Sequence, residues 1–373
     1  MALHAKLSAS GAHRWMACPG SVAAEDGIAD RSSRFAEEGT QAHEVMEQAL
    51  MNQRPCSDFT TDNEMADYVQ IYVDYVEAAR AKMGKDTWMF IERRVDFSEW
   101  VPDGFGTADT IIVSDEVIHI IDLKFGKGVW VHAENNPQAQ LYALGAYAEL
   151  GFIANPKTVR ISIVQPRLDH ISEWELSITD LLKFGETVRQ AALDTTNPNA
   201  KRVPGDKQCR FCKAKATCPA LYKLTEQTLL ADFEQIDEAP AANKLTDEQM
   251  RVVLENKTLV EAWLIAVENL AKEKLAAGAS FPGFKLVEGR SIRKWTDENA
   301  AIDKLEDYMS PDDMYTRKLI SPTQAEKLLG KKNKNKIEGL IMKPPGSPTL
   351  VKDTDPRPAI TAAILDFDDL DEE

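Results

Sequence analysis

Residues 106–124 read GTADTIIVSDEVIHIIDLK, and this stretch decides the fold. Its segments 107–113 and 117–123 are rich in β-branched residues and are separated by three polar residues, so they predict a β-hairpin. Asp109 and Asp122 fall on the two strands of this hairpin. Burying a carboxylate costs free energy unless another group pairs with it, so two aspartates in an apolar hairpin indicate a functional site.

Lys124 follows Asp122 by two residues, and the side-chain period of a strand places both on one face. Hydrolysis of a phosphodiester needs a divalent cation held by carboxylates and a nearby group that orients the attacking water. Asp122 and Lys124 fit that chemistry, but they equally fit an exposed salt bridge at the end of a strand. Gly106 and Gly126 flank the hairpin and would allow close approach of another backbone.

The rest of the first 200 residues supplies further elements of both kinds. Hydrophobic periodicity predicts helices at 8–24, 35–53, 62–83, 137–150 and 181–193, and strands at 87–97, 158–165 and 174–178. The order of these elements predicts a mixed α/β core. Gln138 and Tyr142 are spaced four apart on one of the helices, so they share a face of it.

The C-terminal third differs in composition. We expect a first domain at 1–230, a linker at 231–245, an accessory domain at 246–360 and an acidic tail at 361–373. Thr246, with Gln249 three residues later, predicts a capping box that starts a long helix. A basic run at 331–336 and a basic and aromatic cluster at 290–295 could contact a nucleic acid, and solvated loops are the alternative reading.

Composition narrows the class of protein. The 373 residues carry a formal net charge of −16. This charge argues against binding of nucleic acid through the overall charge of the protein, but it allows a local basic groove. No apolar run approaches the roughly 20 residues that span a bilayer, and the first residues do not resemble a secretory leader. We therefore expect a cytoplasmic protein that does not enter the membrane.

Four of the five cysteines form a ligand-like pattern. Cys209, Cys212 and Cys218 lie within ten residues, and Cys18 lies far upstream in Cys-Pro-Gly. Four thiolates suit Zn²⁺ or an iron–sulfur cluster, and three incidental buried thiols plus one are the alternative. A zinc ribbon usually supplies its ligands as two close pairs, which this spacing does not reproduce. Cys56 is left over as an ordinary free thiol.

The ordered motifs resemble those of a known family. Gly-x-x-Asp at 106–109, hydrophobic-Asp-x-Lys ending at Lys124, and Gln-x-x-x-Tyr at 138–142 follow the order found in PD-(D/E)XK nucleases of the RecB type, and Gly39 with His43 matches their upstream Gly-x-x-x-His. The resemblance covers about residues 10–225. It implies an α/β, restriction-endonuclease-like mixed sheet flanked by helices, with a mainly helical C-terminal extension.

The resemblance also implies a role for each motif residue. Metal ligands for Mg²⁺ or Mn²⁺ would be His43, Asp109, Asp122 and the backbone carbonyl of Leu123; Lys124 would position or activate water; Gln138 and Tyr142 would contact the DNA backbone or brace the site. Glu92 matches a position where such enzymes often carry an acid, although a surface charge is the equal reading. Lys127, His132 and Gln140 are candidates for phosphate contact, with solvated surface as the alternative.

The cysteine spacing resembles a subset of these nucleases. The AddB nuclease domain and the CRISPR-associated RecB-like nucleases bind a 4Fe–4S cluster with one remote and three close cysteines. By that resemblance Cys18, Cys209, Cys212 and Cys218 would join the N-terminal segment to the end of the nuclease domain, with Zn²⁺ as the alternative occupant.

These features predict a metal-dependent DNA nuclease, expected to be an exonuclease in phage or bacterial DNA recombination or processing. The whole chain also resembles phage and prophage proteins that carry a RecB-like nuclease domain and a C-terminal extension. That extension could bind a recombination or single-strand annealing or binding protein. Two other classes remain open: a catalytically silent DNA-binding or scaffold protein on a nuclease fold, and a zinc-stabilised structural protein. The sequence does not indicate an oligomeric state.

Overall fold

The computed structural model describes residues 5–29, 34–229 and 246–279, together with residues 283, 284, 304, 336 and 340. The chain divides into two compact units, residues 1–282 and 283–373, and the first contains nearly all described residues. The predicted linker, the cluster at 290–295, the basic run except Lys336, and the acidic tail lie outside the described residues.

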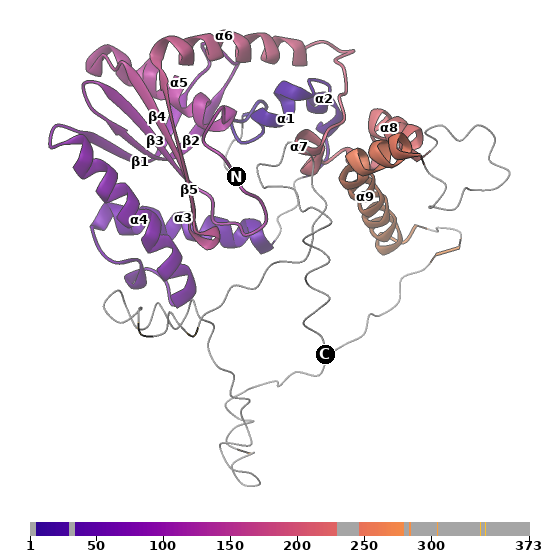
Figure 1. The fold of residues 1–373 in the computed structure, drawn as a ribbon, viewed down its shortest axis with the longest axis horizontal. Helices are drawn as coiled ribbons and strands as arrows, with labels where there is room; N and C mark the ends of the chain where they lie inside the picture. The colour runs from indigo at the N-terminus through magenta and orange to yellow at the C-terminus, as the bar shows by residue number, and fades with distance from the viewer. Residues whose placement is uncertain are drawn as a thin grey trace, which may run out of the picture. The chain divides into compact units, whose positions relative to one another are not determined.

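A five-stranded mixed sheet forms the centre of the first unit (Figure 1). The strands are β1 (Trp88–Asp96), β2 (Phe105–Val113), β3 (Val117–Leu123), β4 (Thr158–Gln165) and β5 (His170–Ser177), in the order β1-β2-β3-β4-β5. All neighbours are antiparallel except β3 and β4, which are parallel. The predicted hairpin is confirmed as β2 and β3, and the α/β fold class is confirmed with it.

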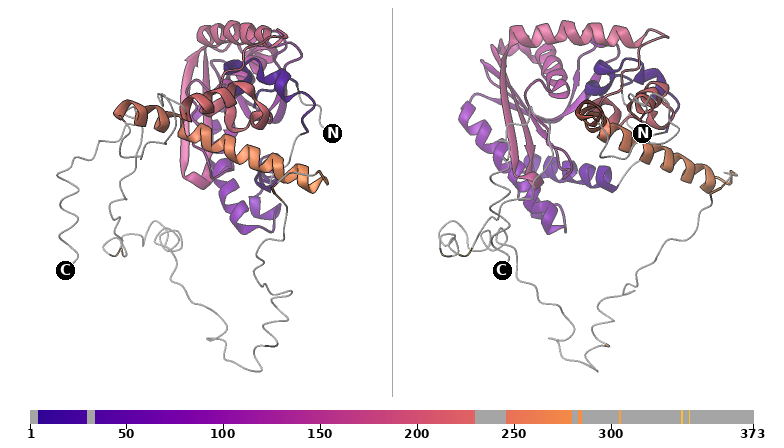
Figure 2. Two further views of the ribbon diagram at one scale, coloured as in Figure 1. Left: turned by 90° about the vertical axis from the view of Figure 1, so that its right-hand side faces the viewer. Right: turned by 45° about the vertical axis from the view of Figure 1, so that its right-hand side comes forward.

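Helices cover both faces of this sheet (Figures 1 and 2). One layer contains α3 (Arg34–Asn52), the short η1 (Cys56–Asp58) and α4 (Asn63–Met83), and the other contains α5 (Pro137–Ala154) and α6 (Ile178–Thr195). Each layer has its own buried apolar cluster against the sheet. The parallel pairing of β3 and β4 requires a crossover, and α5 provides it.

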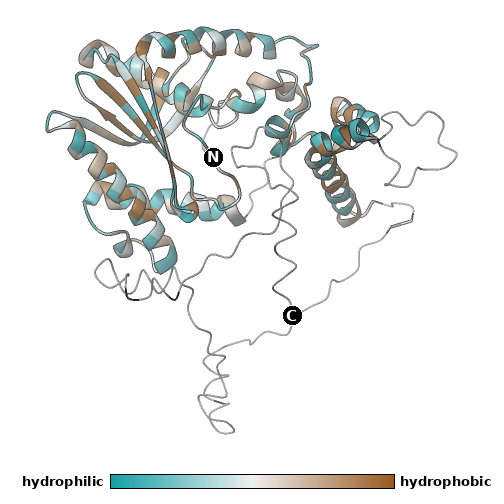
Figure 3. Ribbon diagram, in the orientation of Figure 1, coloured by the Kyte–Doolittle hydropathy of each residue, from teal (hydrophilic) through white to brown (hydrophobic). Residues whose placement is uncertain are grey.

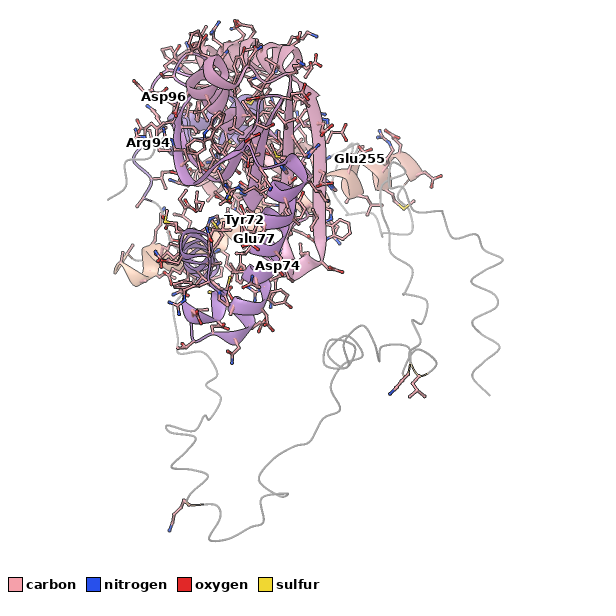
Figure 4. All side chains as sticks on the ribbon, turned by 90° about the vertical axis from the view of Figure 1, so that its left-hand side faces the viewer. Tyr72, Asp74, Glu77, Arg94, Asp96 and Glu255 are labelled. Carbon is pink, nitrogen blue, oxygen red and sulfur yellow. The ribbon has the colours of Figure 1, made fainter. Side chains whose placement is uncertain are left out.

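Side-chain patterning explains which helix face meets the sheet. The central strands β2, β3 and β4 are mostly buried and rich in apolar residues, whereas the outward side of α6 is mainly hydrophilic (Figure 3). On α4, Tyr72 is fully buried while Asp74 and Glu77 are exposed (Figure 4). The helix begins after Asp62, whose carboxylate accepts the Met65 N–H at 3.0 Å.

Two glycines set how closely α5 approaches the sheet. A Cβ atom at Gly145 would lie 2.8 Å from Val95 Cβ on β1. A Cβ atom at Gly106 on β2 would lie 2.7 Å from the ring of Tyr142. Since real Cβ atoms do not come so close to other atoms, the absence of both side chains allows the contact between α5 and the sheet.

The remaining helices lie outside the sheet layers. They are α1 (Ala12–Ala17), α2 (Ser21–Glu25), α7 (Asp206–Arg210), η3 (Lys215–Thr217), α8 (Pro219–Leu229) and α9 (Asp247–Ala276). The helix α9 packs against α7, η3 and α8. Its predicted capping box is confirmed, since the Thr246 and Gln249 side chains each accept the other's backbone N–H.

Two boundary predictions were wrong. Residues 8–24 form two short helices, because Cys18, Pro19 and Gly20 interrupt the helical backbone between α1 and α2. The last strand begins at His170 and not at residue 174. It pairs with β4 over its whole length, and a short turn, η2 (Pro166–Leu168), connects the two strands.

Within the described residues, no helix combines the length and the apolar character that a membrane span requires.

Candidate active site

His43, Glu92 and Asp109 bring their ligand atoms together from three elements. The imidazole Nδ1 of His43 on α3 lies 3.3 Å from Glu92 Oε1 on β1 and 3.4 Å from Asp109 Oδ1 on β2. The three ligand atoms lie within 4.8 Å of one another, which is close enough for all three to bind one metal ion. An imidazole nitrogen with carboxylate oxygens is a donor set that Mn²⁺ accepts, and the carboxylates also suit Mg²⁺.

Glu92 reaches this group through an unusual backbone. It lies between the register pairs Ile91↔Thr110 and Arg93↔Ala108, so it faces Asp109 across β1 and β2. Its φ is +45°, a left-handed value that a non-glycine residue adopts rarely within a strand. Such strain persists where the surrounding structure enforces it, and it concentrates at functional sites. The sequence allowed Glu92 to be a surface charge, and the structure places it beside His43.

Asp122 and Lys124 form a second pair beside the first group. Lys124 Nζ donates to Asp122 Oδ1 at 3.0 Å and lies 2.7 Å from Oδ2, which is buried and accepts no well-aligned hydrogen bond. Asp122 is 2% exposed, so the pair is not an exposed salt bridge on the surface. In this arrangement Asp122 contacts Lys124 and is not among the three grouped ligands.

The proximity of these charges shifts several pKa values. Burial lowers the pKa of His43, but the Asp109 and Glu92 carboxylates outweigh it and raise the pKa to about 10. Burial raises the pKa of Asp122 to about 6, although the Lys124 ammonium acts in the opposite direction. Burial also lowers the pKa of Lys124, but Asp122 and Asp109 raise it above its ordinary value. Without a cation, His43 therefore carries the positive charge that the acids require.

The backbone of β3 fixes one of the carboxylates. The N–H of Leu123 donates to Asp109 Oδ2 at 2.6 Å, which leaves Oδ1 toward His43. Beneath the strands, the hydroxyl of Tyr72 lies 2.9 Å from both Thr110 Oγ1 and the carbonyl oxygen of Ile121. Tyr72 was not predicted, because a tyrosine at a buried helix position carries no signal of its contacts in the sequence.

Gln138 and Tyr142 do share one helix face, as predicted. The Gln138 amide donates to the Tyr142 hydroxyl at 3.0 Å, and Tyr142 is buried against Gly106. Burial and the Asp122 carboxylate raise the pKa of the Tyr142 phenol above its ordinary value. The pair therefore stands next to Asp122 on the α5 side of the site.

Arg167 holds α3 in place and was also missed. Its guanidinium lies 2.9 Å from Glu38 Oε1, 3.7 Å from Glu64 Oε1 and 4.8 Å from the centre of the Phe125 ring. Glu38 precedes His43 on α3, so the arginine positions the helix that carries the histidine. Sequence reasoning had no signal for it, because the contact depends on the turn that follows β4.

Gly39 lies one turn before His43 on the same helix. A Cβ added there meets no atom of the described residues within 4 Å, and the residue has no positive φ. Neither packing nor backbone geometry therefore requires glycine, which otherwise destabilises a helix interior by roughly 0.5–1 kcal/mol relative to alanine. The described residues therefore leave open space beside α3 at this position.

The three candidates for phosphate contact are placed differently. Lys127 is exposed and lies 3.4 Å from Glu64 Oε1. His132 contacts the edge of the His170 ring. Gln140 is buried, and its amide donates to the Asn136 carbonyl at 3.3 Å. Lys127 is thus the one of the three with a cation at the surface.

The four predicted ligand cysteines line one small pocket away from the sheet. Cys18 follows α1, Cys209 lies in α7, and Cys212 and Cys218 flank η3, with Val203, Pro204 and Leu221 among the apolar lining. All four thiols are free, and so is the buried Cys56. They do not form a group with ligand atoms within 4.8 Å of one another, unlike the three residues around His43.

Main-chain donors point at this pocket. The N–H of Val203 donates to Cys18 Sγ at 3.2 Å, and the N–H of Gly205 donates to Cys209 Sγ at 3.4 Å. Burial raises the pKa of the Cys212 thiol to about 12, and the Glu25 carboxylate adds to the effect. The thiol is therefore neutral unless a bound cation stabilises its thiolate.

Comparison with known proteins gives a family and a distant structural match. The profile of the DUF2800 family, described as a protein of unknown function, matches residues 4–358. Among solved structures, the chain is similar to the one titled "Crystal structure of SSO0001", with 16% identity over 59% of this chain and 89% of that chain and a TM-score of 0.27. A TM-score this low carries no argument about function.

Proposed function

We propose that this chain, which belongs to the DUF2800 family, is a metal-dependent nuclease that hydrolyses DNA. The observation that carries the proposal is the convergence of His43, Glu92 and Asp109 beside the ion pair of the buried Asp122 with Lys124. Four secondary-structure elements supply these residues, so the sequence has no local reason to gather them. Two buried aspartates, a partly exposed glutamate and lysine, and a histidine in one place are groups that metal-assisted phosphodiester hydrolysis uses.

The donor set fits a divalent cation such as Mn²⁺ or Mg²⁺. His43, Glu92 and Asp109 would hold it, and the buried Asp122 Oδ2, which accepts no hydrogen bond, would be a further ligand once Lys124 turns toward substrate. The Leu123 carbonyl remains a predicted ligand. The cation would supply a polarised water and neutralise charge on the phosphate during its hydrolysis.

The protein's own groups then have separate tasks. Lys124 holds the attacking water or a phosphate oxygen, because its ammonium lies beside Asp122 and is partly exposed. Gln138 and Tyr142 brace this side of the site through their mutual hydrogen bond. The water oxygen gives up a proton to solvent and forms a bond to phosphorus, the opposite phosphorus–oxygen bond breaks, and the leaving oxygen takes a proton from solvent; by family resemblance the product keeps a 5′-phosphate.

The cysteine pocket supports a bound cofactor in the same protein. Four cysteines around one pocket suit either Zn²⁺ or an iron–sulfur cluster, and their one-plus-three spacing favours the cluster by family resemblance. An iron–sulfur cluster is larger, and N–H donors to its cysteine sulfurs are a common feature. We therefore propose a 4Fe–4S cluster, which would join the N-terminal segment to α7 and η3.

Cleavage of end-labelled DNA tests the proposal directly. Anaerobically purified full-length protein is incubated with linear, nicked and circular DNA in Mn²⁺, in Mg²⁺ and in EDTA. Asp122→Asn should lower the rate by about 10²- to 10³-fold with the fold retained by circular dichroism. Asp115→Asn, in the exposed turn between β2 and β3, is the matched control and should cleave like the wild type. Loss of linear DNA with circles spared would indicate an exonuclease.

The competing function is a DNA-binding or scaffold protein on a silent nuclease fold. It predicts DNA binding without cleavage in either metal, and identical behaviour of the Asp122 and Asp115 variants. A visible absorbance band near ~400 nm would separate a cluster from zinc, because zinc is d¹⁰ and colourless.

A further inference from the structure

The loop 124–136, which leads from the proposed site on β3 to α5, is fixed to the neighbouring strands by side chains. The buried amide of Gln165 accepts the Val131 N–H at 2.7 Å and donates to the Val129 carbonyl at 2.8 Å. The hydroxyl of Ser172 accepts a further N–H of the loop at 2.9 Å. The loop therefore presents its side chains from a defined backbone.

This loop carries a large aromatic side chain into solvent. Trp130 is 64% exposed, yet its ring stacks on the His170 imidazole with centroids 5.1 Å apart and planes inclined by 13°. His132 meets the same imidazole edge-on at 5.6 Å. His170 Nε2 is buried and has no hydrogen-bond partner. An exposed indole held flat in this way is a preformed surface for another planar group.

The strand register shows how near this surface lies to the charged site. Leu123, Val164 and Ile171 form one row across β3, β4 and β5. The next row contains His170, which lies two strands away from Lys124. With strands roughly 4.8 Å apart, the two backbones are about 10 Å apart. That is the length of about three stacked nucleotides at 3.4 Å each.

Two glycines, Gly126 and Gly128, lie between Lys124 and Trp130 in the loop. Among the residues that the structure describes, no atom lies within 4 Å of a Cβ added at Gly126 or Gly128, and neither glycine has a positive φ. Packing and backbone geometry therefore do not require these glycines. A chain lying along the loop could pass close to its backbone.

We infer that Trp130, stacked on His170, binds an unpaired nucleobase of the substrate, and that this nuclease therefore prefers single-stranded DNA or frayed ends. The inference rests on the proposed function. In a duplex both faces of an internal base are already stacked, so the indole can take only an unpaired or terminal base. Stacking accepts any base, because each has a flat π-face, so the preference is for strandedness and not for sequence.

The test combines protein and substrate changes. Full-length wild type, Trp130→Ala, Trp130→Phe and the control Trp88→Ala, an exposed tryptophan on β1, are assayed on single-stranded and duplex DNA. We expect Trp130→Ala to lower kcat/KM on single strands by about 10- to 100-fold, with less than about a threefold change on duplex. Trp130→Phe should lower kcat/KM on single strands less than Trp130→Ala does, and Trp88→Ala should have the same kcat/KM as the wild type.

An abasic site moved along the single strand identifies the stacked base. At one position it should lower wild-type binding and cleavage by the factor that Trp130→Ala causes, and it should leave the variant unaffected. The inference would be overturned if Trp130→Ala lowered kcat/KM equally on single-stranded and duplex DNA, or if no position of the abasic site affected the wild type. Cleavage by the wild type would still support the proposed nuclease activity. Binding that depends on Trp130 and on the abasic position, with no cleavage, would overturn the nuclease and keep the stacking site. Absence of both binding and cleavage would refute both.

Discussion

The charged site on the sheet and the cysteine pocket outside it are built in opposite ways. His43, Asp109 and Lys124 already have partners among the residues of the site, and strands or a long helix position them. The cysteines lie on turns and helices of five residues or fewer, and their sulfurs accept two main-chain hydrogen bonds. The first site should therefore stay folded without its cation, while the second should depend on what it binds.

The largest expected effect tests that dependence. Cys218→Ser should lower the free energy of unfolding of the loaded protein by more than about 5 kcal/mol, because the free energy of metal binding is part of the free energy of folding. Cys56→Ala removes a buried thiol outside the pocket and should cost only about 1–2 kcal/mol. Denaturant unfolding with iron and sulfide analysis measures both. Equal stability of the Cys218 variant and the wild type would show that the pocket holds no structural cofactor.

The next effect separates the stability of the charged site from its activity. Gly39→Ala should stabilise α3 by roughly 0.5–1 kcal/mol, since none of the described residues contacts the added methyl group. The same change should lower DNA cleavage by about 10- to 100-fold if substrate passes beside His43. Thermal unfolding and kcat/KM are measured on one preparation. A variant that is both more stable and fully active would exclude close passage of the substrate along α3.

The smallest effect concerns protons at the charged site. The pKa of His43 is raised to about 10, so at pH 7–8 a bound cation must displace about one proton. The affinity for Mn²⁺ should therefore rise up to about tenfold per pH unit in this range. Calorimetry in buffers of different ionisation enthalpy counts the proton, and His43→Gln should abolish its release. Unchanged proton release in that variant would show that another group titrates.

The raised pKa of His43 also makes the stability of the cation-free protein depend on pH. The folded-state pKa of His43 lies above its unfolded value near 6.5. Its contribution to stability is therefore complete below pH 6.5 and is lost as the pH rises toward 10. A cation at the site would replace the imidazolium charge, so loaded protein should lack this loss.

How far the sequence predicted the structure depended on the range of the contacts. The hairpin of β2 and β3, the helix of Gln138 and Tyr142, and the cap at Thr246 rest on local patterns and were confirmed. Glu92 could not be placed, because its role depends on a left-handed φ and on the register opposite Asp109. Arg167 and the ring stack of Trp130 depend on where separate strands end, which no local pattern encodes.

The absence of a side chain at Gly145 sets the distance between α5 and β1. Gln138 lies seven residues before Gly145 on the same helix, about 10 Å along its axis. A methyl group at position 145 would push the middle of α5 away from β1. The N-terminal end of the helix would then tilt, and the Gln138–Tyr142 pair would shift relative to Asp122. A residue that contacts neither Asp122 nor the Gln138–Tyr142 pair therefore decides how the two are aligned.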